Sequence, residues 1–218
     1  MEAGKLAPVM APVGIPDSNL VSAALEDARA SLRQVPDDGW GLPAAGLDWT
    51  CRETMAHILD DLGAYAMQLS GTHGHERYAP LMEFSLTPGR PACMFWPEES
   101  GGTRAVLDCL DAVGGLLVAV IASVPADRTG WHPYGNPDRS ALAAMGIVEL
   151  VLHTRDILGA HHIDYRAPAQ IVAPCLERIF AHAVRSDDPW HDLLAATGRT
   201  PESRGRAWRW NSTARGVL

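Results

Sequence analysis

The sequence has little basic charge and few cysteines. Among its 218 residues, 18 are lysine or arginine and 26 are aspartate or glutamate, so the formal net charge is −8 at pH 7. A chain this acidic lacks the positive surface with which proteins attract nucleic acids and anionic membranes. Its four cysteines lie far apart and form no CxxC pair, which excludes a zinc–thiolate motif and argues against a set of disulfide bonds. We therefore expect reduced thiols and a cytoplasmic protein.

Long hydrophobic runs are also missing. The most apolar stretch, residues 113–124, is about a dozen residues long, whereas a helix that spans a bilayer needs roughly 20. The first residues do not resemble a signal peptide, because Glu2 is acidic and prolines interrupt the apolar positions. We therefore expect no membrane association. The hydrophobic share of 47% does allow a buried core, as in a soluble globular protein of one domain or of a domain with a small appendage.

Apolar residues at helical spacing predict four long helices, at about 18–33, 48–71, 102–124 and 138–159. Shorter helices are predicted at about 174–183 and 189–197. Four amphipathic helices of this length favour an all-α fold, a four-helix bundle within residues 1–165. Residues 166–218 would then form a short, mainly helical C-terminal extension packed on the bundle.

The link between the second and third helices, residues 72–100, is long for a connection in a compact domain. Several prolines interrupt any helical pattern in it. Such a link can carry the chain back across the bundle. We therefore expect a long crossover, with helices two and three parallel and helices two and four antiparallel.

The fourth helix carries three ionisable groups on one side. At about 100° per residue, Glu149 and His153 lie about 40° apart on the helical wheel, and Asp156 lies about 20° to the other side of Glu149. The surrounding positions are apolar, so this helix is predicted to be central, and its charged groups need partners. A divalent metal would satisfy Glu149 and His153 together, with Asp156 orienting an imidazole. An ordinary Glu–His or Glu–Arg pair inside the bundle is the alternative.

His57 of the second helix is the candidate for a third ligand. It lies off the apolar stripe of its helix, where a lone histidine is more often a surface residue. Its depth favours it, however, because His57 lies nine residues from the helix start at Asp48, while Glu149 and His153 lie about ten and six residues before the end of theirs. In antiparallel helices the three groups meet at one level. Two imidazoles and a carboxylate with an open fourth position form a catalytic type of metal site, which suits zinc, although other divalent ions accept it.

Three segments resemble a known family. Residues 49–58, WTCRETMAHI, are similar to the GWT-x-R-D-x-x-A-H-L segment of the mycothiol-dependent maleylpyruvate isomerase family, part of the wider DinB-like superfamily. Residues 149–157, ELVLHTRDI, are similar to that family's E-x-x-x-H-x-W-D-L segment, with Arg155 where the family usually has tryptophan. Residues 188–199 resemble a stretch common in actinobacterial members. The resemblance covers most of the chain, roughly residues 18–200.

The resemblance implies a DinB-like bundle with a metal held by His57, Glu149 and His153. It also implies a mycothiol-dependent isomerase or S-transferase in an actinobacterial cytosol, in which a metal-bound thiolate adds to an electrophilic small molecule. The region after residue 165 is too short for the full C-terminal domain of the isomerase, and we can match no thiol-binding arginine there. Two alternatives therefore stay open. One is a non-catalytic metal- or small-molecule-binding protein, and the other is a metal-assisted hydrolase.

Two loops carry the candidates for a binding pocket. The links 72–100 and 131–137 hold aromatic side chains that could cover a site and exclude water from it, and Trp96, His132 and Tyr134 are the named candidates. We assign no catalytic residue beyond the metal site. The expected partners are a small electrophile and a low-molecular-weight thiol, and a homodimer is left open.

Overall fold

The computed structural model describes residues 14–203 and 209–215, and within them the fold is all-α, as predicted. The long helices are α1 (Ser18–Leu32), α2 (Cys51–Ser70), α3 (Gly102–Ser123) and α4 (Arg139–Ala160). The shorter elements are the 3₁₀ turns η1 (Asp37–Gly41) and η2 (Glu99–Gly101) and the helices α5 (Ala169–Ile179) and α6 (Pro189–Ala196). β structure in the described residues is limited to isolated bridges.

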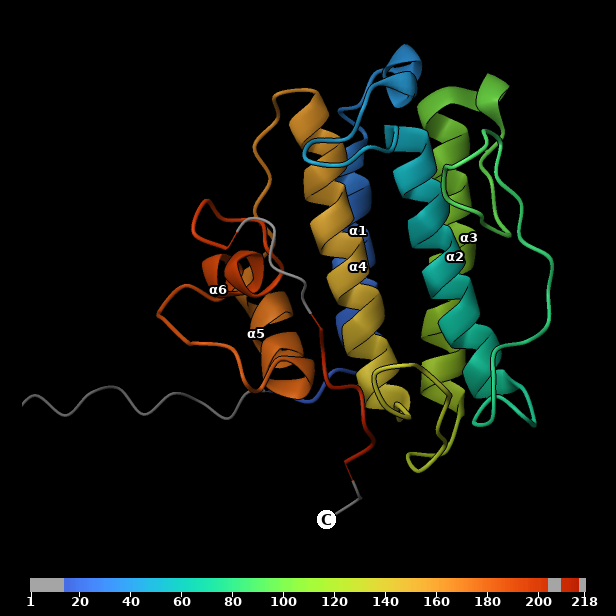
Figure 1. Cartoon of the computed structure of the whole chain (residues 1–218), viewed down its shortest axis with the longest axis vertical. Coiled ribbons are helices and arrows are strands. Elements are labelled where there is room, and N and C mark those ends of the chain that lie inside the picture. Colours follow the sequence, from blue (N-terminus) through green and yellow to red (C-terminus); the bar gives the residue numbers. More distant parts are fainter. Residues whose placement is uncertain (1–13, 204–208, 216–218) are drawn as a thin grey trace, which may run out of the picture.

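Helices α1 to α4 form a bundle in which α2 packs against α3 and α4, and α1 packs against the same two helices. The colours of Figure 1 show that α2 and α3 run in the same direction and that α4 runs the opposite way. The crossover from α2 to α3 returns along the outside of the bundle. The predicted parallel and antiparallel pairs are confirmed.

Side-chain caps fix where α2 and α4 begin. Thr50 Oγ1 accepts a hydrogen bond from Glu53 N at 3.2 Å, and Thr50 N donates to the Glu53 carboxylate at 2.7 Å, which is a capping box. At the start of α4, Asp138 Oδ1 accepts a hydrogen bond from Ala141 N at 2.9 Å. These caps set the register of every residue that follows in each helix.

α4 is the central helix of the molecule. Every residue from Ala141 to Thr154 is buried. α1, α2 and α5 cover it from different sides, which explains why its sequence is apolar nearly all round. Glu149 and His153 therefore lie inside the protein, where their charges must be balanced by other protein groups or by a bound ion.

The fifth helix begins earlier than the sequence predicts. α5 starts at Ala169, so Pro174 lies inside it rather than near its first turn. A proline inside a helix removes one backbone hydrogen bond and crowds the preceding turn. Here the buried side chains of Ile171, Cys175 and Ile179 lie on both sides of that proline, so packing onto α4 outweighs its cost.

α3 contradicts the expectation that no stretch of the chain is long and apolar enough to span a membrane. Residues Glu99–Ser123 form a 25-residue helical stretch whose most apolar 18-residue window has a mean hydropathy of 2.1 and is 28% buried, so by length and composition alone it could cross a membrane. The core helix of a soluble protein can meet the same criterion. Val106, Leu110 and Leu117 of α3 are buried in the bundle.

The C-terminal extension lies against α4. α5 packs on α4, and α6 packs on α5 (Figure 1). Arg178 of α5 donates to Asp138, the cap residue at the start of α4, at 2.9 Å. The segment after α6 reaches the last turns of α4, where Arg199 contacts Asp156. The extension therefore contacts the bundle near both ends of its central helix.

Candidate metal centre

α2 and α4 bring His57, Glu149 and His153 together. One possible ligand atom from each lies within 4.8 Å of the other two. Glu149 Oε2 is 3.6 Å from His57 Nε2 and 3.1 Å from His153 Nε2. The ring centroids of the two histidines are 5.1 Å apart. The three residues that the sequence analysis named as ligands therefore converge on one point.

The contact between the start of α2 and the end of α4 fixes the height in the bundle at which the two histidines meet. Cys51 Sγ lies 3.9 Å from the carbonyl oxygen of Ile157. His57 follows Cys51 by about 9 Å along α2, and His153 precedes Ile157 by about 6 Å along α4, at roughly 1.5 Å per residue. Because the helices are antiparallel, both histidines reach nearly the same height from opposite chain directions.

Asp156 holds the imidazole of His153. Its Oδ2 atom lies 3.1 Å from His153 Nδ1 and accepts a hydrogen bond from Arg199 Nη2 at 2.8 Å. Burial alone would raise the pKa of Asp156, but the hydrogen bonds from His153 and Arg199 lower it, so the carboxylate is ionised and only accepts. Nδ1 of His153 therefore carries the proton. In the neutral ring, Nε2 then presents its lone pair toward Glu149.

The electrostatics of the cluster call for positive charge. Burial alone would raise the pKa of Glu149, but His153 and His57 lower it below its usual range. Burial would likewise lower the pKa of both histidines. Instead Asp61 and Glu149 raise the pKa of His57 to about 9, and Asp156 and Glu149 raise that of His153. Protons on the imidazoles can thus balance the buried carboxylates, and a divalent cation would balance the same charges.

Asp61 is a charged group near the centre that the sequence analysis did not assign. Its Oδ2 atom lies 3.4 Å from His57 Nε2, one helical turn away. Burial raises the pKa of Asp61 to about 7. The spacing of four residues between His57 and Asp61 was the available signal. It is weak on its own, because neighbouring aspartates such as Asp60 and Asp61 usually belong to a solvated helix face.

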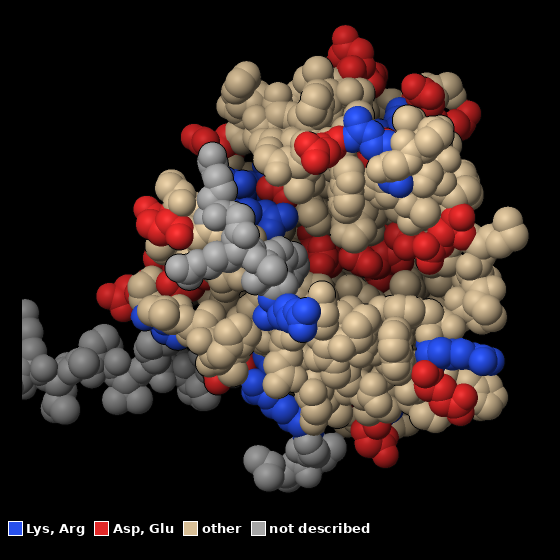
Figure 2. Space-filling model, in the orientation of Figure 1, with Lys and Arg blue, Asp and Glu red and all other residues tan. Residues whose placement is uncertain are grey.

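The cluster opens onto a cleft of about 790 Å³. Its other walls are residues 45–47 and Trp49, which precede α2, residues 155–156 of α4, and residues 197–199 of the C-terminal extension. The ring of Trp49 lies against both histidines, with centroids 5.1 Å from His57 and 6.5 Å from His153. Figure 2 shows a hollow across this face, with basic atoms at its left end and acidic atoms along its middle and right.

The loop residues named as pocket candidates lie elsewhere. His132 lines a second cavity, of about 120 Å³, that is separate from the cleft. Trp96 is hydrogen-bonded to backbone carbonyls within its own loop, and Tyr134 packs against His132. Among the described residues that line the cleft, none comes from these two loops. The loops 72–100 and 131–137 instead contribute walls to the smaller cavity.

The donor set fits a divalent transition-metal ion. Tetrahedral ligands about 2.0–2.2 Å from zinc lie roughly 3.3–3.6 Å from one another. The distances from Glu149 Oε2 to the two imidazole nitrogens, 3.1 and 3.6 Å, are close to this range. Two imidazoles and one carboxylate leave room for a further ligand from the cleft. A carboxylate such as Asp156 on the far nitrogen of a histidine is the usual outer partner of a metal ligand.

An all-α bundle with a buried His–Glu–His cluster beside a cleft defines a class of four-helix proteins with a candidate metal centre between α2 and α4. The family model of the DinB superfamily matches residues 20–157, a range that includes all three candidate ligands, and the chain belongs to this superfamily.

The comparison with solved structures gives a likeness in fold. A crystal structure of a mutant of the mycothiol-dependent maleylpyruvate isomerase resembles the chain with a TM-score of 0.51 and 12% sequence identity. The likeness covers 72% of this chain and 65% of that one. No curated protein sequence matches the chain.

Proposed function

We propose that this protein is a metal-dependent enzyme that uses a low-molecular-weight thiol to isomerise or conjugate an electrophilic small molecule. The observation that carries this proposal is the convergence of His57, Glu149 and His153 beside a large cleft. Zinc as the metal, mycothiol as the thiol and an actinobacterial cytoplasm as the setting belong to the same proposal. The similarity of the 49–58 and 149–157 segments to the isomerase family and the likeness in fold support them.

The cysteines of the chain do not suit the role of nucleophile. All four are free. Burial raises the pKa of Cys51 to about 11 and that of Cys93 to about 12, and it also raises the pKa values of Cys109 and Cys175. Such thiols stay protonated at neutral pH. A reactive sulfur at the cleft would therefore come from a small molecule.

The side chains around the cluster have distinct tasks in this proposal. A divalent ion bound here would lower the pKa of a coordinating thiol, which supplies a nucleophile at neutral pH. Asp156 and Arg199 keep His153 in one orientation. Trp49 covers both imidazoles and limits the access of water to them. Arg155 lines the cleft and places positive charge where a polar part of the thiol could bind.

Thiol-dependent turnover tests the proposal. The metal-loaded protein is incubated with mycothiol and a slow-reacting α,β-unsaturated ketone, and adduct or isomer formation is followed by mass spectrometry. Wild type should exceed the uncatalysed rate clearly, and Glu149→Gln, which keeps the shape of the side chain, should return the rate to background.

Three other outcomes would reject this function. Equal rates for wild type, variant and a protein-free control would favour the non-catalytic binding protein. Metal-dependent cleavage of ester or amide probes without thiol would favour the hydrolase. Failure of the protein to bind any divalent ion would remove the basis of both enzyme proposals.

A further inference from the structure

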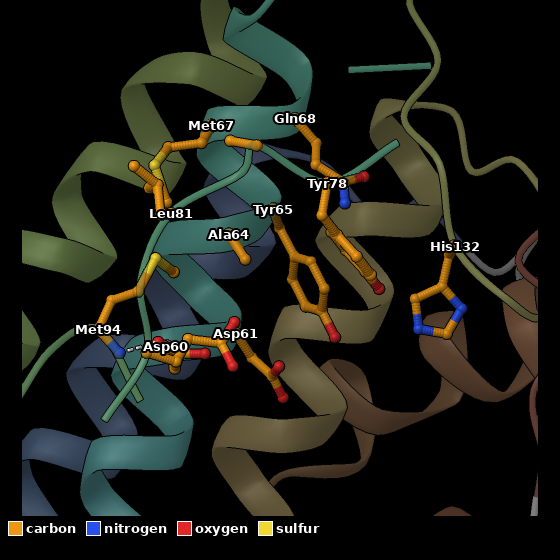
Figure 3. A pocket seen from close by; sticks show the side chains of 12 residues that line it. Asp60, Asp61, Ala64, Tyr65, Met67, Gln68, Tyr78, Leu81, Met94 and His132 are labelled. Atoms are coloured by element: carbon orange, nitrogen blue, oxygen red, sulfur yellow. Dashed lines mark hydrogen bonds between the residues drawn. The ribbon is translucent and has the colours of Figure 1, made fainter. Parts of the chain in front are cut away.

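We propose that the smaller cavity beside α2 is a second substrate subsite, and that it binds the protonated amine of a small molecule that also carries a hydrogen-bond acceptor. This inference rests on the proposed function, because it names the substrate class that would reach the same centre. The cavity, of about 120 Å³, lies where α2 faces residues 78–83, Met94 and His132 (Figure 3).

The cavity reaches the candidate metal centre through Asp61. This residue lines the cavity, and its Oδ2 atom lies 3.4 Å from His57 Nε2. His57 in turn lines the larger cleft, and the two hollows share none of the lining residues that the structure describes. A molecule in the smaller cavity therefore approaches the centre separately from a molecule in the cleft. Such an arrangement suits a reaction between two substrates.

The charge of the cavity selects against anions. Asp60, Asp61 and Glu83 line it, and none of its described lining residues is lysine or arginine. Burial raises the pKa of Asp60 and, to about 7, that of Asp61, and a bound ammonium group would favour the ionised form of both. Burial lowers the pKa of His132, so this ring adds no positive charge at neutral pH. Asp60 Oδ1 accepts a hydrogen bond from Met94 N at 2.6 Å, which leaves its second oxygen for a ligand.

The aromatic walls also suit a cation. Tyr65 and Tyr78 lie side by side in the cavity, between the aspartates and Gln68 (Figure 3). Burial raises the pKa of Tyr78 to about 12, so its phenol stays uncharged at neutral pH. Carboxylates together with aromatic faces are the groups that bind an ammonium ion in proteins.

Gln68 provides an independent sign of a ligand. The residue is only 3% exposed, and its Nε2 atom has no hydrogen-bond partner in the part of the chain that the structure describes. Its Oε1 atom accepts a hydrogen bond from Trp131 N at 3.0 Å. The amide orientation is therefore fixed, because exchanging its ends would place two N–H groups against each other. The N–H group therefore has no acceptor among the described residues, and a ligand in the cavity could supply one.

The positions of these groups define the ligand. Gln68 lies at the opposite end of the cavity from Asp60 and Asp61 (Figure 3). It follows Asp61 by seven residues, which is about two turns, or roughly 10 Å, along the same face of α2. A ligand that satisfies both ends carries an ammonium group at one end and a carbonyl or hydroxyl oxygen at the other. A dicarboxylate would instead face three acidic side chains.

A matched set of probes tests this inference. γ-Aminobutyramide, butyramide and succinamate share a chain length and an amide but are cationic, neutral and anionic. Ligand-observed NMR titrations measure their binding to the metal-loaded and the metal-free protein without thiol. γ-Aminobutyramide should bind most tightly and succinamate least.

Variants place the binding in the cavity. Asp60→Asn keeps an acceptor for Met94 N but removes the charge, so it should weaken γ-aminobutyramide about tenfold and leave butyramide unchanged. Asp127→Asn removes the same charge from an exposed loop and should have no effect. Gln68→Glu keeps an acceptor for Trp131 N but loses the donor, so it should weaken butyramide.

The inference is wrong if succinamate or butyramide binds wild type as tightly as γ-aminobutyramide, or if no probe binds. It is also wrong if Asp60→Asn and Asp127→Asn behave alike. These outcomes leave the proposed reaction standing, because no turnover is measured. Conversely, amine binding by a protein that shows no thiol-dependent turnover would reject the proposed function and keep the subsite.

Discussion

At the scale of single residues, Glu149 dominates the electrostatics of the candidate centre. It is buried in the central helix and contacts both His57 and His153. A buried carboxylate without a positive partner costs several kcal/mol. The centre therefore holds either protons on its imidazoles or a cation in their place, and the two compete.

Removal of one imidazole should strongly weaken metal binding. Wild type, once loaded and desalted, should hold about one divalent ion per chain, and His153→Ala should bind it more than about 100-fold more weakly, because changes to outer partners alone cost 10–100-fold. Elemental analysis and titration with a chelating indicator measure this. His191→Ala, which removes an exposed histidine, is the control. Equal metal content in the two variants would contradict the assignment.

The raised pKa of His57 predicts a pH dependence. In the metal-free protein its pKa is raised from 6.5 to about 9, so its contribution to stability is full below pH 6.5 and is lost as the pH rises through 9. A metal needs the neutral ring, so metal affinity should rise over the same range. Thermal unfolding with metal and with chelator at several pH values measures both trends. A metal-induced shift in Tm that does not change with pH would argue against His57 as a ligand.

At the scale of elements, the long crossover packs closely against α2 at Gly63. A Cβ atom added at Gly63 would lie 2.4 Å from the ring of Phe95, which packs there from the crossover. Gly63→Ala should therefore destabilise the protein by about 1–3 kcal/mol through overpacking. Gly115 in α3 has open space at the same position, so Gly115→Ala should stabilise by up to about 1 kcal/mol. Urea denaturation compares them, and the same sign for both would refute the packing argument.

The segment after α6 should influence the metal centre through Arg199. Its guanidinium contacts Asp156, which orients His153. Arg199→Gln should weaken metal binding about 10–100-fold, because the imidazole of His153 loses its fixed orientation. The helix content should change little. Arg104→Gln, at an exposed position on α3, is the matched control. Isothermal titration calorimetry measures both affinities, and indistinguishable values would assign Arg199 a purely structural role.

Element boundaries could be predicted where local chemistry dominates. The predicted starts, at about 48 and 138, lie within three residues of the observed starts of α2 and α4, where Thr50 and Asp138 cap the helices. The start of α5 could not be predicted in this way. Its position depends on packing against α4, which overrides the local signal of Pro174.

At the scale of the whole molecule, the long crossover was enough to predict the direction of the helices, and hence the approach of His57 to His153. The walls of the cleft and of the smaller cavity could not be predicted in this way. The cleft is lined in part by Arg199, far along the chain, and the smaller cavity depends on how residues 78–83 fold onto α2. Neither segment has a periodicity that places it. Contacts made by segments without regular secondary structure produce no periodic pattern that a single sequence could show.

The division into a bundle, residues 1–165, and an extension, residues 166–218, is itself a prediction. The extension supplies buried core residues, among them Ile171, Trp190 and Leu193, and it covers one side of α4. A chain that ends at residue 165 should therefore expose an apolar surface and aggregate or unfold at a lower temperature. Size-exclusion chromatography and near-UV circular dichroism measure this, and co-expression of 166–218 should restore solubility. A soluble, cooperatively folded monomer of residues 1–165 would instead establish the bundle as a domain that folds without its extension.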